Sequence, residues 1–178
     1  MSRAFVDEDS GSDETDDMHE IPLPLAPGVK NYMTPGGALR MMEELRTLID
    51  VERPRAAAAL AAADAQAKAS PLREISRIDR RISYLSRMKA FMEVVQPPSS
   101  LERMVFGLVA RVDEGSDQEV YYRIVGVDES DPERGWVSWA SPVAKALIGK
   151  SVGDLAVVKL PLGERRMKII GIEYAKEE

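Results

Sequence analysis

Residues 69–96, ASPLREISRIDRRISYLSRMKAFMEVVQ, decide the fold of the first half of this chain. Their apolar side chains recur at spacings of three and four, the period of a coiled-coil stripe: Leu72, Ile75, Ile78, Ile82, Leu85, Met88, Met92 and Val95. Upstream, the same period runs through Leu39, Met42, Leu45 and Leu48, and an alanine-rich stretch at 56–69 follows. The pattern predicts two helices folded back on each other as an antiparallel hairpin, with a turn just before the second seam.

Proline and its neighbours mark the expected helix ends. Thr34-Pro35 predicts an N-cap and first helical residue for the first arm, and Ser70-Pro71 predicts the same start for the second arm. Prolines 97 and 98 predict where the second arm stops. Pro54 predicts a kink or short break near residues 52–54, because proline removes a helical hydrogen bond and clashes with the preceding turn.

From residue 104 the periodicity changes to short β-type runs separated by Asp, Glu, Gly, Ser and Pro clusters. The runs cover residues 104–112, 120–127, 136–139, 155–160 and 167–174. Ser141-Pro142 opens a short helix that ends before Gly149. The expected fold class is therefore α+β, with a helical hairpin (coiled coil) at 31–96, a linker at 97–103, and an antiparallel β-sheet domain with one short helix at 104–178.

The net charge of the chain resides in its first 30 residues. They contain eight acids and two bases, which accounts for the whole net charge of −6. Because they also contain three prolines and few large apolar side chains, residues 1–30 are expected to form a disordered acidic tail. The chain has no cysteine and no apolar run near the roughly 20 residues that span a bilayer, so a cytoplasmic protein without membrane contact is expected.

Few residues offer catalytic or metal-binding chemistry. The single histidine, His19, lies in the acidic tail, so neither a nucleophilic triad nor a histidine metal site is expected. Near the turn lies a group of cations, here called the basic stripe: Lys68, Arg73, Arg77, Arg80 and Arg81. It predicts contact with nucleic-acid phosphates or, as the plainer alternative, a solvated helix face on which Glu74 and Asp79 pair with arginines.

Several segments resemble the GreA/GreB family of bacterial transcript-cleavage factors, which insert a helical hairpin into the secondary channel of RNA polymerase. The segments are NYMTPGG at 31–37, VERP at 51–54, IDRRISYL at 78–85, VFG at 105–107, YRIVG at 122–126, SPVAKALIGKSVGD at 141–154 and IEY at 172–174. They follow the family's order over about residues 31–174.

The resemblance implies an FKBP-like second domain that grips the polymerase at the channel rim. Ser141 and Pro142 fall in the rim-binding patch, although Ala140 stands where the GreB type has an acid. The resemblance also implies that the protein's partner is RNA polymerase, that it meets nucleic acid only within the transcription complex, that it is a monomer, and that it has no cofactor of its own.

The hairpin tip departs from the family pattern. Cleavage factors carry a motif like G-D-x-S-E-N-A-E-Y there, whose Asp and Glu complete the coordination of a catalytic magnesium ion in the polymerase. An ungapped reading from residues 51–54 places Lys68 and Pro71 at those two positions, with Ser70 between them. Magnesium takes oxygen ligands, and an ammonium group repels a cation. The interval from Pro54 to residue 78 is also shorter by roughly seven residues, which retracts the tip by about 5 Å.

These features predict a Gre-like regulator that binds RNA polymerase without supporting cleavage and is not itself an enzyme. One alternative is an active cleavage factor that uses Asp64 and Glu74 across the turn. Two hypotheses from different functional classes are a peptidyl-prolyl isomerase, which the ten aromatic residues of the chain disfavour, and a coiled-coil adaptor unrelated to transcription. A further hypothesis is that the acidic residues 7–20 fold back on the basic residues 73–81 and mask them.

Overall fold

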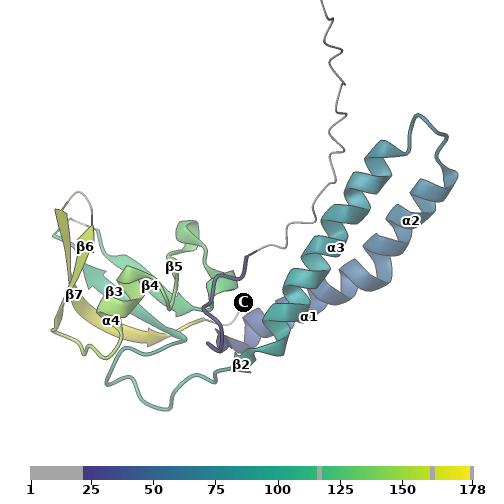
Figure 1. Cartoon of the computed structure of the whole chain (residues 1–178). Coiled ribbons are helices and arrows are strands. Elements are labelled where there is room, and N and C mark those ends of the chain that lie inside the picture. The colour runs from purple at the N-terminus through teal and green to yellow at the C-terminus, as the bar shows by residue number, and fades with distance from the viewer. Residues whose placement is uncertain (1–21, 116–117, 161–162, 177–178) are drawn as a thin grey trace, which may run out of the picture.

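The computed structural model describes residues 22–115, 118–160 and 163–176. A helical hairpin projects from a second unit that is built on a five-stranded sheet (Figure 1). The α+β class is confirmed. Most of the expected acidic tail, residues 1–21, lies outside the described residues.

The first arm of the hairpin begins where the sequence predicts. α1 (Pro35–Thr47) is capped by Thr34, whose side-chain oxygen accepts a hydrogen bond from the Gly37 N–H at 3.0 Å. The arm continues through a π-helical turn, η1 (Leu48–Glu52), into α2 (Arg53–Ala62). Proline cannot donate an N–H, and a π turn changes the hydrogen-bond register just before Pro54. The predicted irregularity is therefore present as a π turn at residues 48–52, but the helix is not broken at residues 52–54, where the backbone stays helical.

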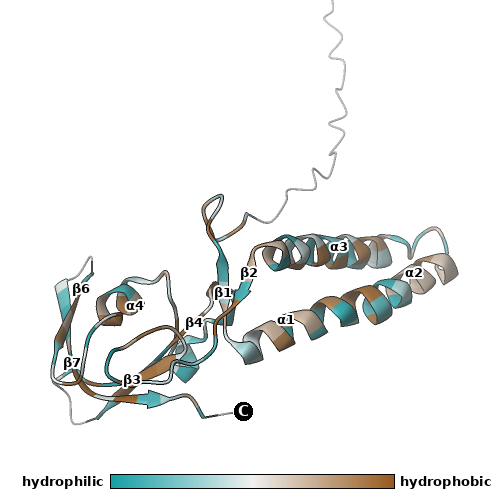
Figure 2. Cartoon of the chain, turned by 90° about the horizontal axis from the view of Figure 1, so that it is seen from below, coloured by the Kyte–Doolittle hydropathy of each residue, from teal (hydrophilic) through white to brown (hydrophobic). Residues whose placement is uncertain are grey.

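The returning arm is α3 (Ala69–Ala90), and it packs along α1, η1 and, most closely, α2. The two arms lie side by side in Figure 2. Between them they bury one apolar cluster, whose main members are Met41, Leu45, Leu48, Ala56, Ile78, Leu85 and Met88. The predicted seam is wrong at its ends, because Leu39 is 67% exposed and Leu72 is 50% exposed. Steps of three residues drift around a helix of 3.6 residues per turn, so packing follows Met41 and Leu45 rather than Leu39 and Met42.

The start of α3 differs from the prediction. Lys68 occupies the N-cap position and makes no side-chain capping bond, so the predicted cap at Ser70 is wrong. Ser70 and Pro71 lie in the first turn of the helix instead. Proline is tolerated there because the first four N–H groups of a helix have no acceptor within it.

The end of α3 also differs, because the helix stops at Ala90 rather than at the prolines. The chain then forms β2 (Met92–Val94), which pairs in parallel with β1 (Asn31–Met33). The Val95 N–H donates to the carbonyl of Met33 at 2.9 Å. Met92 and Val95, predicted as seam residues, thus belong to or adjoin this small sheet, which no pattern in the sequence indicates.

The second unit is a mixed sheet in the order β5-β4-β3-β7-β6. The strands are β3 (Leu108–Asp113), β4 (Val120–Val125), β5 (Trp136–Ser138), β6 (Leu155–Leu160) and β7 (Gly163–Tyr174). The expected antiparallel sheet is wrong at β5, which runs parallel to β4 because the connection through η2 (Val127–Glu129) and η3 (Pro132–Arg134) returns the chain in the same direction. The predicted helix, α4 (Pro142–Leu147), is confirmed and buries Ala144 and Leu147.

A buried carboxylate joins the hairpin to the sheet. Glu129, in η2, is 8% exposed, and its oxygens accept hydrogen bonds from the N–H groups of Thr34 and Gly126, both at 3.0 Å, and from the Thr34 hydroxyl. A Cβ at position 37 would lie 2.0 Å from the same carboxylate, so only glycine fits there. The cap of α1 is therefore completed by a residue of the sheet unit.

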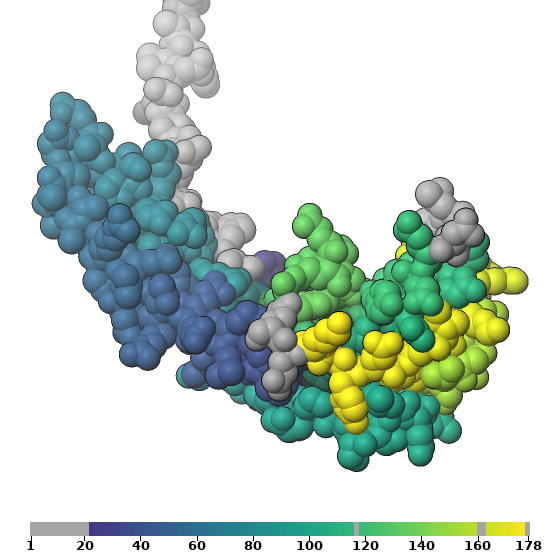
Figure 3. Space-filling model, turned by 180° about the vertical axis from the view of Figure 1, so that it is seen from behind, coloured from purple at the N-terminus to yellow at the C-terminus, as the bar shows by residue number. Residues whose placement is uncertain are grey.

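Aromatic residues make further contacts at this junction. The Tyr84 hydroxyl on α3 donates to the Asp128 carboxylate at 2.6 Å, and burial, reinforced by this bond, raises the pKa of Tyr84. The Tyr32 ring in β1 meets the Trp139 ring edge-on, with centroids 5.6 Å apart. Figure 3 shows the hairpin joining the sheet unit at its base while its tip stands clear. The sheet therefore holds the base of the hairpin and leaves the tip exposed.

Candidate functional site

The hairpin tip is a short turn between α2 and α3. α2 ends at Ala62, Ala63 is extended, and α3 begins at residue 69. A carboxylate oxygen of Asp64 accepts a hydrogen bond from the Ala67 N–H at 3.0 Å, so this acid stabilises the turn itself. Of the three predicted tip residues, Lys68 ends the turn, whereas Ser70 and Pro71 lie within α3.

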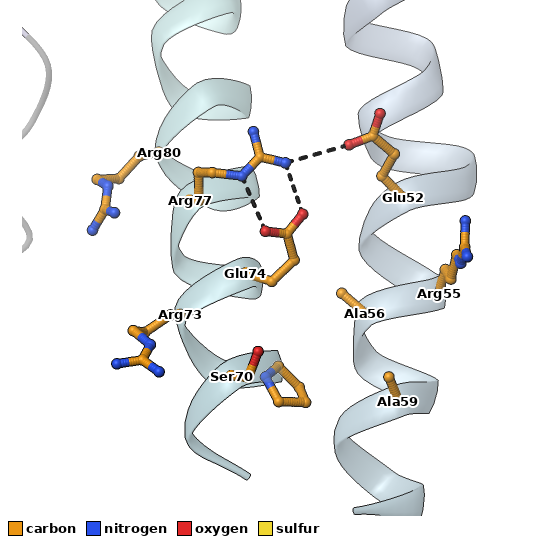
Figure 4. A pocket seen from close by; sticks show the side chains of 10 residues that line it. Glu52, Arg55, Ala56, Ala59, Ser70, Arg73, Glu74, Arg77 and Arg80 are labelled. Carbon is orange, nitrogen blue, oxygen red and sulfur yellow. Dashed lines mark hydrogen bonds and ion pairs between the residues drawn. The ribbon is translucent and has the colours of Figure 1, made fainter. Parts of the chain in front are cut away.

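A groove of about 780 Å³ separates the two arms next to this turn (Figure 4). Its lining residues are Glu52, Arg55, Ala56, Ala59, Ser70, Pro71, Arg73, Glu74, Arg77 and Arg80. On the α2 side the side chains of Ala56 and Ala59 point toward α3, and Ala56 also belongs to the buried apolar cluster of the hairpin. No large apolar side chain lines the groove, so it begins where the large apolar residues of the hairpin seam end.

Two arginines of the basic stripe are held by carboxylates. Arg77 donates to both oxygens of Glu74, at 3.1 and 2.7 Å, and lies 3.8 Å from Glu52 on the other arm. These hydrogen bonds lower the pKa of Glu74 and keep it ionised. Arg81 makes a two-pronged pair with Glu44 on α1, at 2.6 and 2.9 Å. The Arg77–Glu74 pair agrees with the plainer prediction of an ion-paired helix face. Arg81 pairs with the other arm instead, and Asp79, expected to pair along the helix, accepts hydrogen bonds from Arg53 of α2.

The other cations near the tip are not engaged in this way. Within the part of the chain that the structure describes, no hydrogen bond or ion pair joins the side chains of Arg55, Lys68, Arg73 or Arg80 to an acid. Figure 4 shows Arg73 and Arg80 on the same side of α3, pointing away from α2. Arg55, Lys68 and Arg73 are exposed and Arg80 is partly exposed, so cations without an acidic partner among the described residues lie on both arms near the tip.

The alternative acid pair is not assembled for metal binding. Asp64 is used in the turn, and Glu74 is bound by Arg77. No cluster of three or more His, Cys, Asp or Glu side chains suited to a metal ion occurs among residues 22–115, 118–160 and 163–176. Asp64 and Glu74 thus each have another partner and do not form a shared magnesium site in this structure.

The predicted rim-binding residues lie at the start of α4. The Ser141 hydroxyl caps the helix by accepting a hydrogen bond from the Ala144 N–H at 3.1 Å, and Pro142 is exposed at the first helical position. Sequence reasoning missed four exposed apolar side chains that follow α4 along the chain: Ile148, Val152, Leu155 and Val157. The signal was present in β6, where Leu155 to Val158 are apolar on both faces although β6 is an edge strand.

A search of the described helices finds none with the length and apolarity required to span a bilayer.

Comparison with known proteins finds relatives over most of the chain. The family profile described as "Transcription elongation factor, GreA/GreB, C-term" matches residues 99–174. The transcription elongation factor GreB of Xanthomonas axonopodis pv. citri (strain 306) is 38% identical over 152 residues, covering 80% of this chain and 90% of the relative. GreA of Anaeromyxobacter sp. (strain K) is 37% identical over 155 residues, covering 82% and 93%.

Two solved structures also match. The GreA factor homolog Gfh1 of Thermus thermophilus shares 23% identity, with 82% of this chain and 99% of that chain covered and a TM-score of 0.37. The GreA/GreB factor of Nitrosomonas europaea shares 21% identity, with 82% and 99% covered and a TM-score of 0.39. The identities of the GreB and GreA relatives, which extend through the hairpin and the sheet unit alike, decide the assignment: the chain belongs to the GreA/GreB family of transcription elongation factors.

Proposed function

We propose that this protein binds RNA polymerase, places its hairpin in the secondary channel, and regulates transcription without stimulating transcript cleavage. The state of the carboxylates near the tip carries the proposal. Asp64 accepts a hydrogen bond within its own turn, and Glu74 is neutralised by Arg77. A factor that completes a magnesium site has to present free oxygen ligands, and here the tip presents the ammonium of Lys68 instead.

The remainder of the molecule suits a polymerase-bound regulator. The hairpin base is fixed by Glu129, so the rod has a defined direction relative to the sheet unit. Pro142, exposed beside the capping Ser141, is the proposed contact with the channel rim. The relatives offer no support for the peptidyl-prolyl isomerase alternative. The protein would act by occupying the channel or by competing with cleavage factors, and would not be an enzyme itself.

A transcript-cleavage assay tests the proposal. A stalled, backtracked RNA polymerase complex is incubated with this protein and magnesium at neutral pH, and release of short 3′ RNA fragments is measured. No release is expected, while release stimulated by an active GreB-type factor should fall as this protein is added. Failure to inhibit that factor, together with failure to bind core polymerase, would refute the polymerase-binding part.

Two sets of variants separate the chemistry of the tip from binding. Replacing residues 64–77 with a full-length acidic tip should produce cleavage, because the sheet unit is unchanged, whereas Lys68→Asp or Pro71→Glu alone should not. Asp64→Asn and Glu74→Gln test the alternative, in which the protein is an active cleavage factor that uses these two acids. Robust cleavage by the unmodified protein that is lost in either of these variants would overturn the proposal and assign the magnesium ligands to that pair.

A further inference from the structure

The segment that precedes the hairpin is anchored at the hairpin base. Leu23 and Leu25 are partly buried against the apolar cluster of the two arms, and the Val29 N–H closes a turn by donating to the Ala26 carbonyl at 3.1 Å. Figures 1 and 2 both place this segment beside β1 and the end of α3. The described chain, which starts at residue 22, is therefore held at the base of the hairpin.

The sequence immediately before this anchor is strongly acidic. Its carboxylates are Asp7, Glu8, Asp9, Asp13, Glu14, Asp16, Asp17 and Glu20. Over residues 7–20 no lysine or arginine offsets them. A segment of this charge is attracted to a cationic surface within its reach, because each contact with a cation offsets the repulsion among the carboxylates.

The exposed face of α3 supplies such a surface. Arg73 and Arg80 share one side of the helix, and neither forms an ion pair with any acid of the described residues. Arg77 and Arg81, by contrast, are already paired with Glu74 and Glu44. The structure thus divides the arginines of the basic stripe into two that are ion-paired within the fold and two, Arg73 and Arg80, that have no acidic partner among the described residues.

Chain length permits the contact. At 1.5 Å per residue, Arg80 lies about 15 Å and Arg73 about 25 Å along α3 from its end at Ala90. A flexible chain of the length from Leu23 back to Asp7 has an end-to-end distance of roughly 20 Å, and fully extended it spans about 50 Å. Residues 7–20 therefore reach both arginines without leaving the anchored molecule.

We propose that residues 7–20 dock on the tip half of α3 through Arg73 and Arg80, and so cover the cationic face of the hairpin when the protein is free. The contact is intramolecular and does not depend on the proposed function. Since exposed ion pairs are individually weak, its strength comes from the number of carboxylates and from their tethering. A polyanion or a polymerase surface that makes more contacts would displace the acidic segment from α3. The contact would also weaken as the salt concentration rises.

The absence of native cysteine makes a direct test simple. A nitroxide spin label on Ser12→Cys, within the acidic run, should attenuate the amide NMR signals of residues 70–81 in the full-length protein at low ionic strength. High salt should restore these signals. Arg73→Gln combined with Arg80→Gln should restore them as well, whereas the charge-matched pair Lys145→Gln and Arg166→Gln on the sheet unit should leave the attenuation unchanged. All four side chains are on the surface or partly exposed, so the variants should fold normally.

Three results would overturn the proposal. The first is the absence of attenuation on α3, and the second is attenuation that the arginine pair does not relieve. The third is attenuation that appears only between molecules, when spin-labelled protein without ¹⁵N is mixed with unlabelled ¹⁵N protein, since that would assign the acidic segment to a second copy. Attenuation of signals from the sheet unit instead of α3 would overturn the proposal in the same way as no attenuation on α3.

Discussion

The base and the tip of the hairpin are built from the same two arms but differ in what satisfies their side chains. At the base, Leu45 and Leu85 are buried, and Arg81 is paired with Glu44 across the arms. Toward the tip, Ala59 lines a groove, Arg73 is exposed, and the partly exposed Arg80 points away from α2 without an acidic partner among the described residues. The side chains of the base have partners within the fold and stabilise it, whereas these cations near the tip have no such partners in the described part of the chain and contribute little to stability.

This difference indicates how the molecule divides its tasks. A rod that acts at a distance needs a fixed direction, and the buried network around Glu129 supplies it by joining α1 to the sheet unit. The tip needs side chains that are free to meet another surface, because a group already bound within the fold has little to offer a partner. Substitutions at the base should therefore change stability, while substitutions at the tip should change binding.

The largest effect on stability is expected from Glu129→Ala. This change leaves the buried N–H groups of Thr34 and Gly126 without their acceptor, which should lower the free energy of unfolding by about 3 kcal/mol. Urea denaturation followed by circular dichroism measures it. Glu133→Ala, an exposed glutamate of the neighbouring η3, is the matched control and should change stability by less than about 0.5 kcal/mol. Equal effects of the two variants would contradict a structural role for Glu129.

A smaller, pH-dependent effect is expected from Tyr84→Phe, which removes the hydrogen bond to Asp128 and should cost about 1.5 kcal/mol at neutral pH. Because the pKa of Tyr84 is raised in the folded protein above its ordinary value of 10.0, the unfolded chain loses this proton first as the pH increases. The stabilisation is thus fully present below about pH 10 and is lost progressively as the pH rises from there toward the raised pKa of the folded protein. Urea midpoints of both proteins from neutral pH to about pH 11 should converge at the alkaline end, and a constant difference would refute the raised pKa.

The sequence predicts the fold class and most elements because strong local signals mark them. The cap at Thr34, the helix irregularity just before Pro54 and the helix after Ser141 each rest on a single residue whose chemistry acts within one turn. The pairing of β1 with β2 rests instead on three-residue strands about 60 positions apart, too short to show any alternation. The parallel direction of β5 likewise depends on the path of η2 and η3, which local preference does not determine.

The candidate site is less predictable for a related reason. Arg80 and Arg81 are neighbours in the sequence, but a step of one residue turns a helix by about 100°, so only Arg81 faces Glu44 on the other arm. The sequence therefore identifies the basic stripe but not which of its members the fold neutralises. The start of α3 shows the same limit, since proline is accepted at any position of the first turn and does not determine which residue is the cap.

The smallest expected effect compares these two neighbouring arginines. Arg81→Ala breaks a two-pronged pair between the arms and should lower the free energy of unfolding by about 0.5–1 kcal/mol, whereas Arg80→Ala should have almost no effect. Urea denaturation at low and high salt measures both, and the cost of Arg81→Ala should shrink at high salt because the pair is partly exposed. A double-mutant cycle with Glu44→Ala assigns the coupling to the pair. An equal cost for Arg80→Ala would show that the fold uses the exposed arginine too, and the contrast between base and tip would not hold.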